Sequence, residues 1–222
     1  MSFQQDAVII NPKSEHTASV IWLHGLGADG HDFEPIVPEL GLGKDSGIKF
    51  IFPHAPVRPV TINGGMPMRA WYDVRSANLR EMEDTEAIIA SSNLIDNYLD
   101  HEIDAGIASN KIMLAGFSQG GAIALHTGLR YPRPLAGLLA LSTYLPLPDR
   151  LNSEVNNNNK TTPIVMAHGL FDPVIPVEHG RNSCETLKQN GYSVEWYEYT
   201  MQHAVCIEEI IMIGNWIKQL LT

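Results

Sequence analysis

The sequence predicts a single α/β domain, 1–222, with a doubly wound, mostly parallel β-sheet and helices on both of its faces. Three observations lead to this prediction. Short runs of apolar and β-branched residues alternate with helical patterns along the chain. Most of these runs are almost continuously apolar, as expected of parallel strands that are covered on both sides. The length of 222 residues suits one domain of this kind.

Six segments are predicted to be strands of the sheet. They are Ser19–His24, Ile48–Pro53, Lys111–Phe117, Leu135–Ser142, Pro163–Ala167 and Ser193–Tyr199. The last of these alternates apolar and polar residues more than the others do, which indicates a less buried strand. A short N-terminal strand pair, with Asp6–Ile10 as one member, could add an antiparallel edge.

The connecting segments supply four predicted helices. They are Glu83–Glu102, Gln119–Tyr131, Val177–Asn190 and Cys206–Leu221. The first of them has apolar residues at helical spacing and acidic residues at its start. Pro132 ends the second helix and Gly191 the third, and both residue types are common helix stops. The β–α alternation implies right-handed crossovers between parallel strands.

Composition excludes several functional classes. The net charge of -10 and the lack of any Lys- or Arg-rich run argue against nucleic acid as a partner. The N-terminus lacks the pattern of an export signal, and the longest apolar stretch is too short for a transmembrane segment. The two cysteines, Cys184 and Cys206, are interpreted as structural thiols of a reduced protein. We therefore expect a cytoplasmic location.

A candidate nucleophile lies in Gly116-Phe117-Ser118-Gln119-Gly120, which is a G-x-S-x-G motif. The motif alone is weak, but a buried strand leads directly into it and an apolar helix follows it. That order is the nucleophile elbow of α/β-hydrolases. The glycines allow the strand and the helix to approach closely, so that Ser118 stands at the tip of the turn.

A serine nucleophile needs a base and an acid that orients the base. In α/β-hydrolases these follow the serine in the order acid, then histidine. Asp172 and His203 fit this order, and each follows a strand at its carboxyl end, where catalytic groups of open α/β sheets gather. Glu178 is the reserve acid, and His179 is expected on a helix surface.

Two backbone amides are predicted to form an oxyanion hole. Gln119 directly follows the nucleophile, which is the usual place for one donor. Leu26, in the glycine-containing loop after the first strand, is predicted to supply the second donor and to touch substrate. His24 in that loop is expected to be a hydrogen-bonded structural residue.

The long connection around Met66, Met68 and Trp71 suits an apolar acyl-binding wall or lid. We predict these three side chains to be substrate-binding. If the loop is exposed, it could bury itself in a homodimer as easily as contact lipid at a membrane surface.

These segments together resemble the phospholipase/carboxylesterase family, which includes bacterial carboxylesterases and acyl-protein thioesterases. The matching segments are WLHGLGADGHDF, FPHAPVRPVTINGG, RAWYDV, LAGFSQGGAIALHTGL, LALSTYLP, HGLFDPVIP and MQHAVC. The stretch TINGGMPMRAWYD looks more like the carboxylesterases. One departure is Thr200, where the family often has Gly.

The resemblance implies that Ser118, Asp172 and His203 occupy the triad positions and that Leu26 and Gln119 occupy the oxyanion positions. It also implies that no metal and no organic cofactor are needed. The expected function is a serine carboxylesterase acting on short-to-medium acyl esters, either small molecules or lipids. Two alternatives stay open: thioesterase or lysophospholipase activity with the same triad, and a non-catalytic ligand-binding protein on a hydrolase scaffold.

Overall fold

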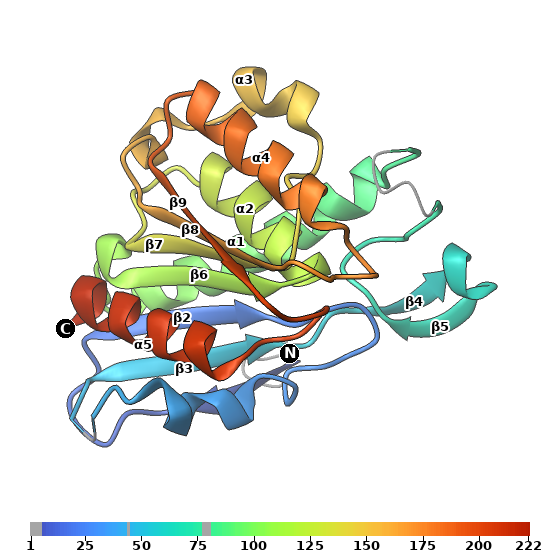
Figure 1. Cartoon of the computed structure of the whole chain (residues 1–222). Helices are drawn as coiled ribbons and strands as arrows, with labels where there is room; N and C mark the ends of the chain where they lie inside the picture. Colours follow the sequence, from blue (N-terminus) through green and yellow to red (C-terminus); the bar gives the residue numbers. More distant parts are fainter. Residues whose placement is uncertain (1–5, 44, 77–80) are drawn as a thin grey trace.

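The computed structural model describes residues 6–43, 45–76 and 81–222. Its core is a seven-stranded sheet in the order β1-β3-β2-β6-β7-β8-β9 (Figure 1). The strands are β1 (Ala7–Ile10), β2 (Ala18–Leu23), β3 (Ile48–Pro53), β6 (Ile112–Phe117), β7 (Gly137–Leu141), β8 (Ile164–Gly169) and β9 (Val194–Tyr199). Only β1 runs antiparallel to its neighbour, and all the other pairs in this sheet are parallel. The predicted fold class and the antiparallel edge are confirmed, although β1 pairs with β3 and not with a second N-terminal strand.

Helices cover both faces of the sheet, as predicted. One face carries α1 (Thr85–Asp104), α2 (Gln119–Arg130) and α4 (Val177–Gln189), and the other carries α5 (Ile207–Leu221) and the 3-10 helix Glu34–Leu40. Alternate residues of one strand serve the two cores: in β2, Ile21 and Leu23 face the first, whereas Val20 and Trp22 face the second. Double-sided burial explains why the strands are almost continuously apolar.

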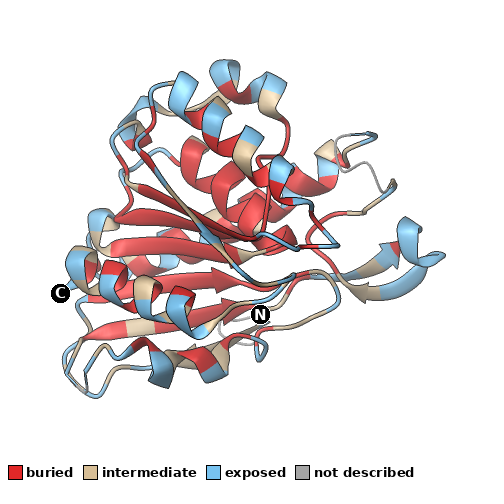
Figure 2. Cartoon of the chain, viewed as in Figure 1, coloured by how far each residue is buried: buried red, intermediate tan, exposed pale blue. Residues whose placement is uncertain are grey.

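The largest difference from the sequence prediction lies between β3 and α1. The segment expected to be a wall or lid contains a separate antiparallel hairpin, β4 (Val57–Val60) and β5 (Met66–Arg69). It projects beyond the carboxyl ends of the parallel strands (Figure 1). Its outer surface is largely exposed, in contrast to the buried central strands (Figure 2). A short helix α3 (Leu151–Glu154) was also not predicted.

Smaller differences concern element ends. The strand β8 continues to Gly169, two residues beyond its predicted end, so that His168 lies within the sheet. Cys206 caps the N-terminus of α5 instead of forming its first turn.

Both cysteines are free, with Cys184 buried and Cys206 half-buried, as expected of structural thiols.

Candidate active site

Ser118 stands at a sharp turn between β6 and α2. Its backbone has φ 55° and ψ -123°, a conformation that a residue with a side chain rarely adopts. Space at the turn is limited: a Cβ atom on Gly116 would lie 2.3 Å from the carbonyl oxygen of Gly120. The neighbouring strand end supports the turn, because the Thr143 hydroxyl donates to the Ser118 carbonyl oxygen at 2.6 Å. The glycines of the motif are therefore required by close approach, as the sequence indicated.

A chain of hydrogen bonds joins the three residues predicted to act together. The His203 Nε2 atom lies 2.9 Å from the Ser118 Oγ, and the His203 Nδ1 atom lies 2.6 Å from Asp172 Oδ2. An ionised aspartate accepts only, so Nδ1–H donates to it and Nε2 is left to accept from the serine hydroxyl. Residues 118, 172 and 203 thus form the donor–acceptor arrangement of a hydrolytic triad.

Asp172 is held as an anion by several donors. Its Oδ1 atom accepts hydrogen bonds from the backbone N–H groups of Val174 and Ile175, at 2.8 Å and 2.9 Å. Burial by itself would raise the pKa of Asp172, but hydrogen bonds from His168, His203 and Ile175 outweigh it and hold the pKa well below its usual range. The carboxylate therefore stays ionised and fixes the tautomer of the imidazole.

His168 is a contact that the sequence reasoning missed. Its Nε2 atom lies 3.3 Å from Asp172 Oδ2 and 2.8 Å from the Ile175 carbonyl oxygen. The side chain is fully buried beside Trp196. The available signal was its place directly after a predicted buried strand, four residues before the candidate acid. A polar residue there must find a partner inside the protein.

The two segments predicted to form the oxyanion hole lie next to the nucleophile. A Cβ atom on Gly25 would lie 3.4 Å from the Ser118 Cβ, so the loop after β2 touches the serine. Among the residues that the structure describes, the backbone N–H groups of Leu26 and Gln119 donate to no backbone acceptor. An oxyanion hole needs N–H donors beside the nucleophile.

His24 is a structural residue, as expected. It is buried, its Nδ1 lies 2.7 Å from the Gly25 carbonyl oxygen, and its Nε2 accepts from the Ala55 N–H at 3.0 Å. Burial lowers the pKa of His24 to about 4. The neutral ring therefore braces the loop instead of transferring protons.

The family model for phospholipases and carboxylesterases matches residues 4–221. The chain belongs to this family.

Relatives within the family carry thioesterase names. The chain is 38% identical to acyl-protein thioesterase 1 of Yarrowia lipolytica, over 96% of both chains. It is 39% identical to the protein of that name from Gibberella zeae, over 99% of this chain and 97% of the relative. The crystal structure of Zea mays acyl-protein thioesterase 2 superposes with a TM-score of 0.86 at 33% identity, covering 97% of this chain and 99% of that one. This family member is therefore a serine hydrolase of the esterase type.

The side chains predicted to bind substrate lie in different environments. Met66 is 62% exposed on the hairpin. Met68 is half-buried, and its sulfur lies 3.7 Å from where a Cβ atom on Gly27 would stand, so it reaches the loop that follows β2. Trp71 corrects our expectation, because it is 0% exposed and cannot line an open pocket. Its indole N–H finds a buried partner, the His24 carbonyl oxygen at 2.9 Å.

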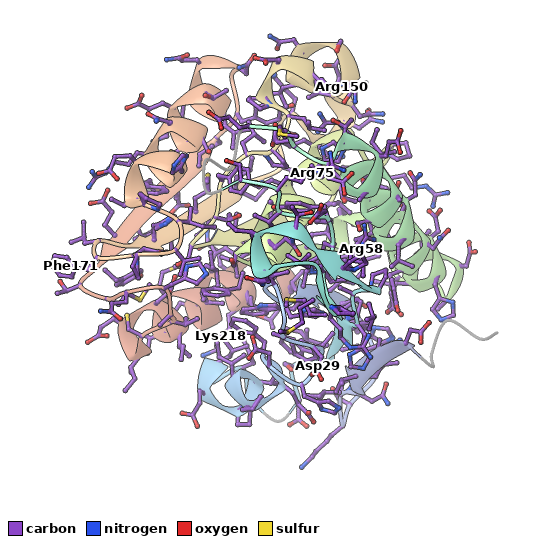
Figure 3. All side chains as sticks on the ribbon, turned by 90° about the vertical axis from the view of Figure 1, so that its right-hand side faces the viewer. Asp29, Arg58, Arg75, Arg150, Phe171 and Lys218 are labelled. Atoms are coloured by element: carbon purple, nitrogen blue, oxygen red, sulfur yellow. The ribbon has the colours of Figure 1, made fainter. Side chains whose placement is uncertain are left out.

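Apolar side chains are exposed around the carboxyl ends of the parallel strands. Figure 3 views the molecule from that side, with Arg58 of the hairpin and Phe171 labelled. These apolar side chains belong to the hairpin region and to the loop that carries Asp172. They are Val57, Ile62, Met66, Leu170, Phe171 and Val174. Within the described part of the chain, no cluster of three or more His, Cys, Asp or Glu residues could hold a metal ion.

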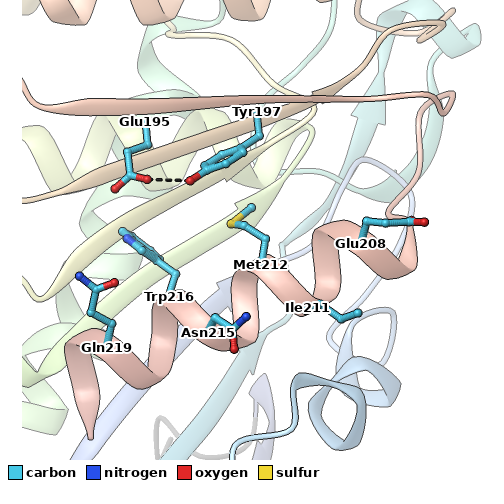
Figure 4. A pocket seen from close by; sticks show the side chains of 8 residues that line it. All are labelled: Glu195, Tyr197, Glu208, Ile211, Met212, Asn215, Trp216 and Gln219. Atoms are coloured by element: carbon cyan, nitrogen blue, oxygen red, sulfur yellow. Dashed lines mark hydrogen bonds between the residues drawn. The ribbon is translucent and has the colours of Figure 1, made fainter.

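A cavity of about 370 Å³ lies elsewhere, between β9 and α5 (Figure 4). Tyr197 in its wall donates to Glu195 at 2.7 Å. None of the residues that line it belongs to the candidate triad. We therefore do not assign substrate to this cavity.

Proposed function

We propose that this family member hydrolyses carboxylic acyl esters through an acyl-enzyme on Ser118. The observation that supports the proposal most directly is the hydrogen-bonded chain from Ser118 through His203 to Asp172, with separations of 2.9 Å and 2.6 Å. A serine hydroxyl is a weak nucleophile at neutral pH, and an imidazole at this distance can accept its proton.

Acylation follows from this geometry. The Ser118 oxygen attacks the ester carbonyl carbon while its proton passes to His203 Nε2. The carbonyl oxygen becomes an oxyanion, which the N–H groups of Leu26 and Gln119 stabilise. When the intermediate collapses, the bond to the leaving oxygen breaks and His203 returns the proton to the departing alcohol. Asp172 remains ionised throughout and stabilises the imidazolium.

Deacylation repeats these steps with water as the nucleophile. His203 removes a proton from a water molecule, whose oxygen attacks the acyl carbon. The bond to Ser118 Oγ then breaks, and His203 protonates that oxygen. The products are the carboxylic acid and the free enzyme.

A second candidate is hydrolysis of acyl thioesters on proteins. The observation that favours it is that relatives 38–39% identical over nearly the whole chain are named acyl-protein thioesterases. The same triad serves both reactions, since a thiolate leaves at least as readily as an alkoxide. Hydrolysis of lysophospholipids needs the same groups and is the third candidate reaction.

The test is a substrate panel with purified protein. The kcat/KM values for p-nitrophenyl acetate and butyrate, an acyl thioester and a lysophospholipid would rank the candidates. Ser118→Ala is the control, and undiminished turnover in it would refute the assignment of the nucleophile. A fluorophosphonate probe that fails to label folded wild-type protein would favour the non-catalytic binding alternative.

Location and assembly form part of the same proposal. No helix of the described residues is long and apolar enough to cross a membrane. We propose a cytoplasmic enzyme whose exposed apolar side chains near the site contact lipid or a second copy of the chain. Sedimentation with lipid vesicles tests for lipid, and analytical ultracentrifugation tests for a second copy of the chain. If the protein shows neither association, substrate is the only ligand left for this surface.

A further inference from the structure

The segment from Arg69 to Tyr72, at the end of the β4–β5 hairpin, lies between the two parts of the oxyanion hole. It contacts the loop after β2 at two points: Gly27 N–H donates to the Arg69 carbonyl oxygen at 2.9 Å, and the Trp71 indole N–H donates to the His24 carbonyl oxygen at 2.9 Å. Leu26 lies between these two attachment points. These two attachments act together with the bonds at the Gly25 carbonyl oxygen, which lies 2.7 Å from His24 Nδ1 and accepts from the Ala28 N–H, to hold the loop that carries the Leu26 amide.

The side chain of Gln119 attaches the same segment to the start of α2. Its Oε1 atom accepts from the Trp71 backbone N–H at 2.7 Å, and its Nε2 atom donates to the Tyr72 carbonyl oxygen at 2.7 Å. One amide group therefore satisfies a donor and an acceptor in adjacent residues. Gln119 is buried, so water cannot replace these bonds.

Trp71 is braced on its other sides. It is 0% exposed, its ring lies 5.2 Å from the His24 ring, and its carbonyl oxygen accepts from the Ser91 hydroxyl of α1. These contacts hold Trp71 against both the loop after β2 and α1, so a shift of Trp71 would also move that loop. Nothing in these contacts brings Trp71 or the Gln119 side chain to the reacting atoms.

We propose that Trp71 and the Gln119 side chain are positioning residues that fix the Leu26 and Gln119 amides relative to each other. The inference rests on the proposed function, because it concerns the oxyanion hole of that reaction. It gives Trp71 a role different from the substrate wall that the sequence suggested. It also gives Gln119 two roles, one through its backbone N–H and one through its side chain.

Two substitutions test the proposal. Trp71→Phe keeps an aromatic ring but removes the bond to His24. Gln119→Met keeps the length and the backbone N–H but removes both side-chain bonds. Losing an oxyanion donor outright costs about 10²–10³ in kcat. Because a misaligned donor retains part of its effect, we expect kcat to fall about tenfold to a hundredfold in each variant. KM should change less than about twofold, since ground-state binding is untouched.

The matched control is Trp216→Phe. Trp216 is 7% exposed on α5, and its ring packs against Gly137 at the start of β7, the end of that strand opposite Thr143. This variant loses the same atoms from a core but breaks no bond to the oxyanion loop. We expect its melting temperature to fall while its kcat well below that temperature stays within about twofold of wild type.

A trifluoromethyl ketone, which forms an oxyanion on the serine, supplies the decisive readout. Its inhibition constant should rise in proportion to the loss of kcat/KM in Trp71→Phe and Gln119→Met. Full kcat and unchanged inhibitor affinity in folded Trp71→Phe would overturn the inference, even if its melting temperature fell. If either variant does not fold, the other decides. Absent turnover in the wild type would instead refute the proposed function, so the two failures are distinguishable.

Discussion

Glu209 is a buried carboxyl group in the first turn of α5, and replacing it should change the pH dependence of stability. It is 0% exposed, and neither carboxylate oxygen has a hydrogen-bond partner of good geometry in the described residues. Burial raises the pKa of Glu209 from 4.5 to about 8, against a smaller lowering by the Cys206 backbone. The folded protein therefore keeps this proton at neutral pH, whereas the unfolded chain releases it.

The sign and size of the effect follow from this difference. Because the folded state binds more protons, the free energy of unfolding falls as the pH rises from 4.5 to about 8 and then levels off. Each pH unit in that window costs about 1.4 kcal/mol, which gives about 3 kcal/mol at pH 7. Glu209→Gln keeps the shape and removes the ionisation. The variant should match wild type near pH 4 and be more stable by about 3 kcal/mol at pH 7.

Urea unfolding of both proteins at several pH values between about 4 and 8 measures this difference. Glu208→Gln is the control, because Glu208 lies in the same turn but is exposed, and its pKa is lowered instead of raised. A stability difference between Glu209→Gln and wild type that does not grow with pH would refute the reasoning. So would a variant that is less stable than wild type at pH 7.

Three further predictions concern the turn and the triad. Asp172→Asn presents an amide that cannot hold the His203 tautomer, and kcat on p-nitrophenyl butyrate should fall about 10⁴-fold; a loss below tenfold would contradict the proposed role. Thr143→Val removes the 2.6 Å bond to the Ser118 carbonyl oxygen and should lower the free energy of unfolding by about 1 kcal/mol in urea. Gly120→Ala places a Cβ 2.4 Å from the Leu23 carbonyl oxygen, so thermal unfolding should show a loss of about 1–3 kcal/mol or more; unchanged melting would mean that the turn can relax.

The central strands were predictable from sequence because their burial is symmetric. In β2 and β6 nearly every residue faces one core or the other, so apolar character is continuous and easily recognised. The β4–β5 hairpin gives no such signal. It is exposed, and Pro59 pairs with Pro67 across it, a residue type that sequence patterns associate with loops.

That Ser118, Asp172 and His203 come together was predictable for a different reason, which is chain order combined with strand ends. Ser118, Asp172 and His203 each follow a recognisable strand, so no knowledge of long-range contacts was needed. Trp71 shows where this approach fails. Whether an aromatic residue in a long connection faces substrate or packs inward depends on a partner 47 residues away, the His24 carbonyl oxygen. Neither composition nor spacing encodes that pairing.

The parallel sheet explains why the carboxyl ends of its strands can hold the whole site. The strands β2, β6, β7, β8 and β9 are consecutive neighbours, and their carboxyl ends lie side by side. The β2 end supplies Leu26, the β6 end Ser118, and the β7 end Thr143, while Asp172 and His203 follow β8 and β9. Each group is thus fixed by the strand before it, and hydrogen bonds between neighbouring strands set their spacing. A change that shifts one strand end should therefore affect the reaction even where it touches no reacting atom.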